Sequence, residues 1–262
     1  MTFQNVVNRE LAKYLPGQIT RENPVVIEGY LAEGNDVKAG GFLFAGTNAD
    51  IQVKGSNTGA AAVVGVAKRT PYQTNFTGSP SDFYNEGAEI TAILKGYVAV
   101  AINSGATKGQ NVFVDPDTGL INTSSSSTIS ATAGSLVFAN VDTTISSWKA
   151  ISDGDLSLKI DGVAKNLTSL NFSSASTMSD VAGVINTALS SEGTCAYNST
   201  TGLTITSATT GKTSSVEFVS SSALATLLGT GISVAGAGAM INTGWKVNMS
   251  CSNGEITEIY NI

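Results

Sequence analysis

Short apolar segments separated by turn residues fill the first 122 residues of the chain, and this pattern constrains the fold more than any other feature. The residues between the segments are mainly Gly, Asn, Asp and Pro, which favour turns because they set or tolerate the backbone angles that turns require. Short strands at regular spacing indicate an all-β barrel or sandwich. The expected strands are residues 25–31, 41–45, 62–67, 89–95, 97–102 and 111–114.

The same pattern returns near the end of the chain. Two strand-like segments, residues 244–251 and 255–260, flank a Ser-Asn-Gly turn. We therefore expect a C-terminal hairpin that belongs with the N-terminal strands. Residues 1–20 lack the alternation, and residues 6–15 within them are compatible with one or two helical turns or with an extended arm.

The content of Ser and Thr marks a boundary inside the chain. Residues 1–122 contain 14 Ser and Thr, whereas residues 123–262 contain 47. The change begins at residues 123–128, Thr-Ser-Ser-Ser-Ser-Thr, a polar run of the kind that forms loops and linkers. A domain boundary or the start of an insertion is expected there.

The interrupting segment has the pattern of a small α+β domain. Residues 155–161 alternate polar and apolar side chains, and Asp161-Gly162 is a strong hairpin signal into residues 163–170. Thr177 and Asp180 have the spacing of a capping box. A helical apolar stripe follows, made of Met178, Val181, Ile185, Ala188 and Leu189. Further strands are expected at residues 194–197, 203–207 and 214–219, with a short helix at 222–228.

These patterns predict a mainly β protein. An N-terminal β-barrel or sandwich is completed by the C-terminal hairpin and carries a small inserted α+β domain. The expected parts are an N-terminal arm at residues 1–20, a β domain at 21–142 plus 236–262, and an inserted domain at 143–235. Such insertions are tolerated where the ends of the guest domain lie close together on a surface loop.

Charge and the absence of histidine argue against several functional classes. The net charge is -6 and only 13% of residues are charged, so no basic stripe is present to bind nucleic acid by counterion release. A chain without histidine lacks the commonest general base and the commonest metal ligand. No apolar stretch reaches the roughly 18 residues that span a bilayer, and the start lacks a signal-peptide pattern. We expect no catalytic, cofactor-binding or metal-binding residue, no nucleic-acid or membrane partner, and cytoplasmic synthesis without a signal peptide.

Two local patterns resemble ligand sites but are better explained as turns. Gly211-Lys212-Thr213 resembles the end of a phosphate-binding loop, yet Thr206 stands where that loop needs Gly, and a strand-like segment follows instead of a helix. The acidic clusters lack the repeated spacing of a calcium loop. They are Asp115 with Asp117, and Asp153 with Asp155 and Asp161.

Most aromatic residues and both cysteines are predicted to be structural. Cys195 and Cys251 match no zinc or disulfide framework and are expected to be reduced thiols. Trp148 and Trp245 flank the inserted segment, so we expect both to be buried at the junction of the domains. The predicted core aromatic residues are Phe42, Phe44, Phe113, Phe138 and Phe172.

Two groups of residues are candidates for contact with a partner. The first lies in the N-terminal arm, where apolar side chains have no evident core of their own. The second lies in the Pro-, Gly- and Asn-rich stretch 70–87, whose aromatic rings are either exposed for a partner or packed within the loop. The candidates are Phe3, Val6, Val7, Leu11, Leu15, Tyr72, Phe76, Phe83 and Tyr84.

The ordered succession of motifs in the first half resembles head decoration proteins of tailed bacteriophages, also called structural cement proteins. The motifs are PVVIEG at residues 24–29, AAVVGVAKR at 61–69, GYVAV at 96–100, GQNVFVDPDTGL at 109–120 and GEITEI at 254–259. Residues 151–162, 180–186 and 200–207 resemble a module of phage tail-sheath-like proteins and, more distantly, of flagellin and hook-associated proteins.

The resemblance implies a non-enzymatic virion protein, made in the host cytoplasm, that binds the outer capsid surface. Its partner would be the major capsid protein, whose neighbouring subunits it would bridge to stabilise the shell. The inserted domain would project outward, and self-association as a trimer or binding as a monomer are both compatible with the sequence. The alternative is a carbohydrate-binding adhesin or a module associated with the tail or its fibres, because low charge and abundant hydroxyl groups are compatible with glycan binding.

Overall fold

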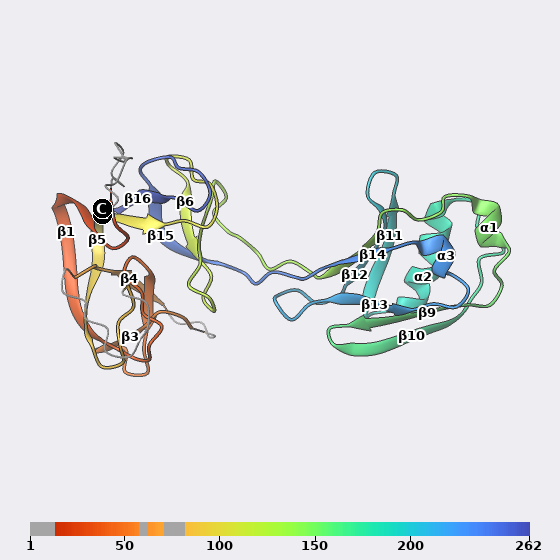
Figure 1. Ribbon diagram of the computed structural model, residues 1–262, viewed down its shortest axis with the longest axis horizontal. Helices are drawn as coiled ribbons and strands as arrows, with labels where there is room; N and C mark the ends of the chain where they lie inside the picture. Colours follow the sequence, from red (N-terminus) through yellow and green to blue (C-terminus); the bar gives the residue numbers. More distant parts are fainter. Residues whose placement is uncertain (1–13, 58–61, 71–81) are drawn as a thin grey trace, which may run out of the picture. The chain divides into compact units, whose positions relative to one another are not determined.

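The computed structural model describes residues 14–57, 62–70 and 82–262. The fold is mainly β, with 45% strand and 9% helix, which confirms the predicted class. The chain divides into two compact units, one formed by residues 1–129 and 240–262 and the other by Ser130–Ala239 (Figure 1). Each unit has its own hydrophobic core.

The first unit is built on a closed five-stranded barrel. The strands are β1 (Ile19–Ala32), β2 (Phe42–Ala45), β3 (Gln52–Lys54), β4 (Val63–Ala67) and β5 (Glu89–Ala101). They follow the order β1-β3-β2-β4-β5, and β5 pairs again with β1 to close the barrel. The sequence predicts two strands where the structure has the single strand β5. The chain continues through Gly96, whose φ of 133 is accessible to glycine.

A second group of strands extends the same sheet from β5. It follows the order β16 (Ile256–Asn261), β15 (Ile241–Val247), β6 (Asn111–Val114) and β7 (Ile121–Ser124). The antiparallel pairing of β16 with β5 runs from Ile256 opposite Ala101 to Asn261 opposite Gly96. The C-terminal hairpin therefore completes the N-terminal sheet, as the sequence predicts.

The inserted unit contains two small sheets and three helices within its residues 130–239. One sheet has the order β10 (Val163–Leu170), β9 (Gly154–Ile160) and β13 (Val216–Ser220). The other has the order β11 (Gly193–Asn198), β12 (Gly202–Ser207), β8 (Ser135–Phe138) and β14 (Gly231–Val234). The helices are α1 (Ile145–Lys149), α2 (Met178–Leu189) and α3 (Ala225–Leu228).

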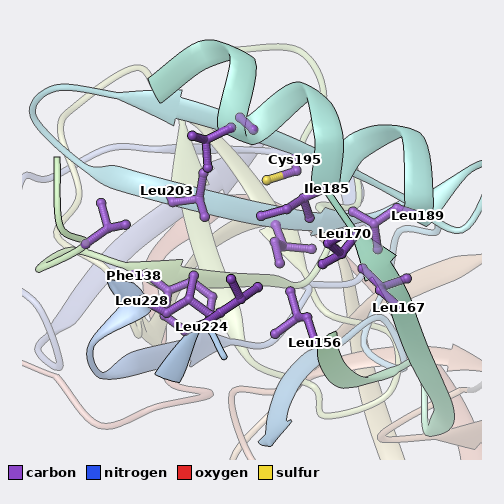
Figure 2. Close-up of a cluster of buried hydrophobic side chains, with 14 of the residues drawn as sticks. Phe138, Leu156, Leu167, Leu170, Ile185, Leu189, Cys195, Leu203, Leu224 and Leu228 are labelled. Carbon is purple, nitrogen blue, oxygen red and sulfur yellow. The ribbon is translucent and has the colours of Figure 1, made fainter. Parts of the chain in front are cut away.

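Helix α2 covers the core of the inserted unit. Its N-terminus has the predicted capping box: the Asp180 backbone N–H donates to Thr177 Oγ1 at 3.2 Å, and the Thr177 N–H donates to Asp180 Oδ2 at 2.8 Å. Figure 2 shows Ile185 and Leu189 directed from α2 into the cluster that also contains Leu170. All three are buried, so the apolar stripe read from the sequence is the buried face of the helix.

Both tryptophans lie in cores, and the expectation that they fill a junction between domains is wrong. Trp148 packs edge-on against Phe172 in the inserted unit, with ring centroids 5.3 Å apart. Trp245 packs edge-on against Phe42 in the first unit, at 6.3 Å. Each ring is almost fully buried, because each is needed to fill the core of its own unit.

The boundaries of the inserted unit differ from those expected. Residues 130–142 and 236–239 belong to the inserted unit and not to the β domain. The reason is that β8 pairs with β12 and β14. The ends of the inserted unit meet, because the Thr132 backbone N–H donates to Ala237 O at 2.9 Å. Within the first unit, Ile129 and Met240 form a β-bridge.

Candidate interaction surface of the barrel

The barrel exposes large apolar side chains along strand β1. Val26, Ile27 and Leu31 are 46%, 50% and 42% exposed, and Ile51, which precedes β3, is 50% exposed. The ladder with β5 is regular from Ile27 to Leu31, so Ile27 and Leu31 lie on the same face of the strand. Two large apolar side chains are therefore accessible on one face of β1.

Among the described residues, no strand pairs with the middle of β1 on the side that faces β3. The Leu31 N–H donates to Ile51 O and the Glu33 N–H donates to Val53 O, each at 2.8 Å, so odd-numbered residues direct their N–H groups toward β3. The pairing with β3 includes only Leu31 and Ala32 of β1. Ile27 and Gly29 direct their polar groups to the same side, and no strand formed by the described residues pairs there. We call the backbone and side chains of residues 27–31 the β1 edge.

A shallow hollow lies beside the β1 edge. It has a volume of about 330 Å³ and is lined by Gly29, Tyr30, Leu31, Ile51 and Glu89. Gly29 leaves it open, since a Cβ at that position would meet no atom within 4 Å. An approaching chain therefore meets an apolar surface with no side chain between Ile27 and Leu31.

Three carboxylates surround the β1 edge. Glu28 is on β1, Glu89 pairs with Leu31 across the ladder, and Asp50 precedes Ile51. None of them has an ion pair among the salt bridges of the described residues. The Tyr30 hydroxyl donates to Glu28 at 2.8 Å, and burial together with this hydrogen bond raises the pKa of Tyr30. Carboxylates therefore lie beside residues 27–31, and Lys95 lies opposite Val26, just before the edge begins.

The start of β1 is fixed to the C-terminal strand by a buried carboxylate. Glu258 is 1% exposed and accepts hydrogen bonds from Arg21 Nε at 3.1 Å and Nη2 at 3.0 Å, and from Thr20 and Asn248. Burial alone would raise the pKa of Glu258, but these hydrogen bonds and the Arg21 charge hold it below the ordinary value. The Arg21 guanidinium also lies 4.3 Å from the ring centre of Tyr97.

A second cavity in the first unit offers little chemistry. Its volume is about 240 Å³, and its lining includes Gly40, Gly41, Gly55 and Gly119. Asp36 lines it but is engaged by the Gly55 N–H at 3.2 Å and the Ser56 hydroxyl at 2.6 Å. No group of His, Cys, Asp or Glu among the described residues could hold a metal ion.

Three of the predicted contact residues fall in the described part of the chain. Leu15 is 53% exposed, and Phe83 is half-buried beneath Lys38, whose Nζ lies 5.8 Å from the ring centre. Tyr84 is 5% exposed and its hydroxyl donates to Lys68 O, so its ring belongs to the barrel core and is not an exposed contact. The other six, Phe3, Val6, Val7, Leu11, Tyr72 and Phe76, lie outside the described residues.

The arm expected over residues 1–20 is wrong for its last part, residues 16–20, whereas residues 1–13 lie outside the described part of the chain. The Gly17 N–H donates to Ala99 O at 2.8 Å, and Arg69 Nε donates to Pro16 O at 2.8 Å. Strand β1 then begins at Ile19. Residues 16–20 are therefore part of the barrel.

Asp161 lies in a turn, as the sequence predicts, whereas Asp155 lies in strand β9, and both hold neighbouring segments by hydrogen bonds. Asp161, at the β9–β10 turn, accepts hydrogen bonds from Ser207, Thr209 and Ser215, and the backbone hydrogen bond from Ser215 is the main cause of its lowered pKa. Asp155 similarly binds the segment before α3. Cys195 and Cys251 are free thiols.

The segment around Gly211 and Lys212 is a turn. Strand β13 follows it, so no helix N-terminus is available to hold a phosphate. The described helices include none that is long and apolar enough to cross a membrane.

The sequence pattern did not reveal the β1 edge. Residues 25–31 read as an ordinary strand, and exposure depends on which neighbours pair with it. The signal that was present is Glu28-Gly29 inside an apolar run, because a carboxylate and a glycine fit poorly in a strand buried on both faces.

Residues 131–241 match the family described as the insert domain of the E217 tail sheath protein gp31. The match covers the inserted unit and less than half of the chain. A chain of the solved structure titled "The capsid of Myoviridae Phage XM1" is similar with a TM-score of 0.37 and 15% sequence identity, over 48% of this chain and 82% of that chain. No curated protein matches the sequence. The family match confirms the resemblance of the inserted segment to tail-sheath-like proteins and supports a phage structural protein.

Proposed function

We propose that the chain is a non-enzymatic virion protein that binds the outer surface of a phage capsid and bridges neighbouring subunits of the major capsid protein. The observation that carries the proposal is the β1 edge, an exposed apolar strand on a closed barrel. Natural proteins usually cover or charge such an edge, because it otherwise pairs with other chains. An edge left accessible is therefore suited to a partner protein.

The stabilising effect on the shell follows from mass action. A protein that binds the assembled lattice and not the separate subunits lowers the free energy of the assembled state by its binding free energy. Contacts to two neighbouring subunits reinforce each other, because the first contact raises the effective concentration of the second. The exposed Leu15, beside the start of β1, would add apolar contact area.

The inserted unit is proposed to project away from the shell. Its ends meet at Thr132 and Ala237, so it can be carried on the barrel without interrupting the sheet. Its match to the insert domain of a tail sheath protein supports a role as an accessory domain of a phage particle.

The test is binding of the purified chain to heads of the phage that encodes it, after the endogenous copy has been removed. The chain should sediment with heads at saturable stoichiometry and raise the temperature at which the heads release DNA. Sedimentation with heads that is indistinguishable from that of an unrelated β-barrel protein would contradict the proposal.

A tail-associated or glycan-binding role is the second candidate, and the family match favours the tail part of it. The low charge and the many Ser and Thr residues of the second half are compatible with glycan binding. Electron microscopy with an antibody against the chain distinguishes the candidates. Label on tails or fibres, together with binding on a glycan array, would favour the second.

A further inference from the structure

We infer that the β1 edge accepts an extended segment of a partner protein as an added strand, and that this segment alternates apolar residues with Lys or Arg. The inference rests on the proposed function for the identity of the partner, the major capsid protein.

The backbone of the β1 edge offers hydrogen-bonding groups to an added strand. Ile27 and Gly29 present N–H and C=O groups on the side of β1 opposite β5, at a spacing that matches the ladder of a strand. Leu31, two residues further along, uses the same side to bind Ile51. β3 pairs only with the last part of β1. An added strand would therefore pair on the same side of β1 with the residues that precede Leu31. Recognition by strand addition derives affinity from such main-chain hydrogen bonds.

The side chains around the β1 edge offer apolar surface to the same strand. Ile27, Leu31 and Ile51 are each at least 42% exposed, and Gly29 leaves open space between the first two. A partner side chain placed over Gly29 would bury apolar surface of both isoleucines and of the leucine. Removing this apolar surface from water is favourable. The partner strand should therefore carry apolar residues on this face.

The carboxylates near the β1 edge favour a partner strand that also carries basic residues. Glu28, Asp50 and Glu89 lie around the edge, and within the described part of the chain none of them forms an ion pair. A basic segment would be attracted to these carboxylates, whereas an acidic segment would be repelled. Because the carboxylates are exposed, the attraction should weaken as salt rises.

The first experiment uses the full chain and two synthetic peptides. The basic peptide is Lys-Val-Arg-Val-Thr-Val-Lys-Thr, and the acidic peptide replaces its Lys and Arg by Glu and Asp. Titration followed by amide chemical shifts should move the signals of Ile27, Gly29 and Leu31 with the basic peptide, at an affinity about tenfold higher than with the acidic one. Equal affinity for both peptides, or shifts confined to other residues, would overturn the inference.

Substitutions separate backbone pairing from side-chain contact. Ile27→Pro removes an N–H of the β1 edge, while the N–H groups that face β5 remain. This variant should bind the basic peptide about fivefold to tenfold more weakly. Ile27→Thr retains the N–H and should weaken binding less. Ile232→Thr is the matched control, because Ile232 is 59% exposed on a strand of the other unit, and it should have no effect.

A charge variant covers the case in which Ile27→Pro fails to fold. Glu28→Lys combined with Glu89→Lys alters two exposed side chains and should reverse the preference toward the acidic peptide. An unchanged preference in this folded variant would contradict the assigned partner chemistry.

Phage heads then distinguish this inference from the proposed function. If the wild-type chain binds heads and the basic peptide displaces it, both stand. If it binds heads but Ile27→Pro binds equally well, the capsid role stands and the edge inference fails. If the basic peptide binds the edge but the chain does not bind heads, the strand-addition site stands and the capsid role fails.

Discussion

Arg21 of β1 and Glu258 of β16 are joined by a pair of parallel hydrogen bonds. Arg21 Nε lies 3.1 Å from Glu258 Oε1, and Arg21 Nη2 lies 3.0 Å from Oε2. Glu258 is buried whereas the Arg21 side chain is 52% exposed. The carboxylate is therefore the constrained partner, and its hydrogen bonds fix the strand that leads to the β1 edge.

Replacing Glu258 should destabilise the first unit. In Glu258→Gln the amide cannot accept all the hydrogen bonds from Arg21, Thr20 and Asn248, and we expect a loss of about 1–3 kcal/mol in the free energy of unfolding. Arg21→Ala should also destabilise the unit, because it leaves the buried Glu258 carboxylate without its cation. Urea unfolding followed by fluorescence measures both, and an unchanged free energy of unfolding in either variant would contradict this role.

The barrel should lose stability in acid. The Thr47 backbone N–H, the Thr47 hydroxyl and Lys54 lower the pKa of Glu33 from 4.5 to about 2, and the pKa of Glu258 is also lowered. A carboxyl group with a lowered folded-state pKa stabilises the fold fully above its unfolded pKa and loses that contribution as pH falls through the folded value. The free energy of unfolding should therefore fall from about pH 5 toward pH 2. Glu33→Gln should flatten this dependence, and an identical slope would refute the assignment.

The capping box of α2 should contribute locally to the inserted unit. Thr177→Ala removes the acceptor for the Asp180 N–H and should lower the free energy of unfolding of the inserted unit by about 1 kcal/mol. Thr177→Ser keeps the acceptor and serves as the control. Calorimetry should show a lower unfolding temperature of the inserted unit for Thr177→Ala. An equal decrease for Thr177→Ser would show that the hydroxyl does not stabilise the helix.

The inserted unit should be removable. Met240 N lies 3.1 Å from Ile129 O, so a short Gly-Ser linker can replace residues 131–238. Because the barrel has its own cores, its unfolding temperature should change by only a few degrees. Binding to heads should also persist, since the β1 edge is retained. Aggregation of the shortened chain at all temperatures would show that the units do not fold separately.

The sequence predicted the features that depend on neighbouring residues along the chain. The capping box at Thr177 and the hairpin at Asp161 are of this kind, and both are present. The change in Ser and Thr content at residues 123–128 lies close to the structural boundary at Ile129, whereas the expected boundary at residue 142 ignored β8. β8 could not be assigned from its four residues, because its pairing partners are distant in the sequence.

Features that depend on tertiary pairing were not predictable from the same patterns. Tyr84 lies within the Pro-, Gly- and Asn-rich stretch 70–87, yet its ring is buried in a core cluster of the barrel. Ile27 and Leu31 have the composition of core residues but are exposed, since β3 pairs with only the last part of β1. Burial and exposure at these positions follow from strand order, which local periodicity does not determine.

Electron cryomicroscopy of intact particles of the phage that encodes the chain tests the central claim most directly. The account predicts density for the five-stranded barrel on the outer surface of the head, in contact with two neighbouring major capsid protein subunits, with an extended segment of one subunit beside residues 27–31. Density for the chain only on the tail, with none on the head, would contradict it.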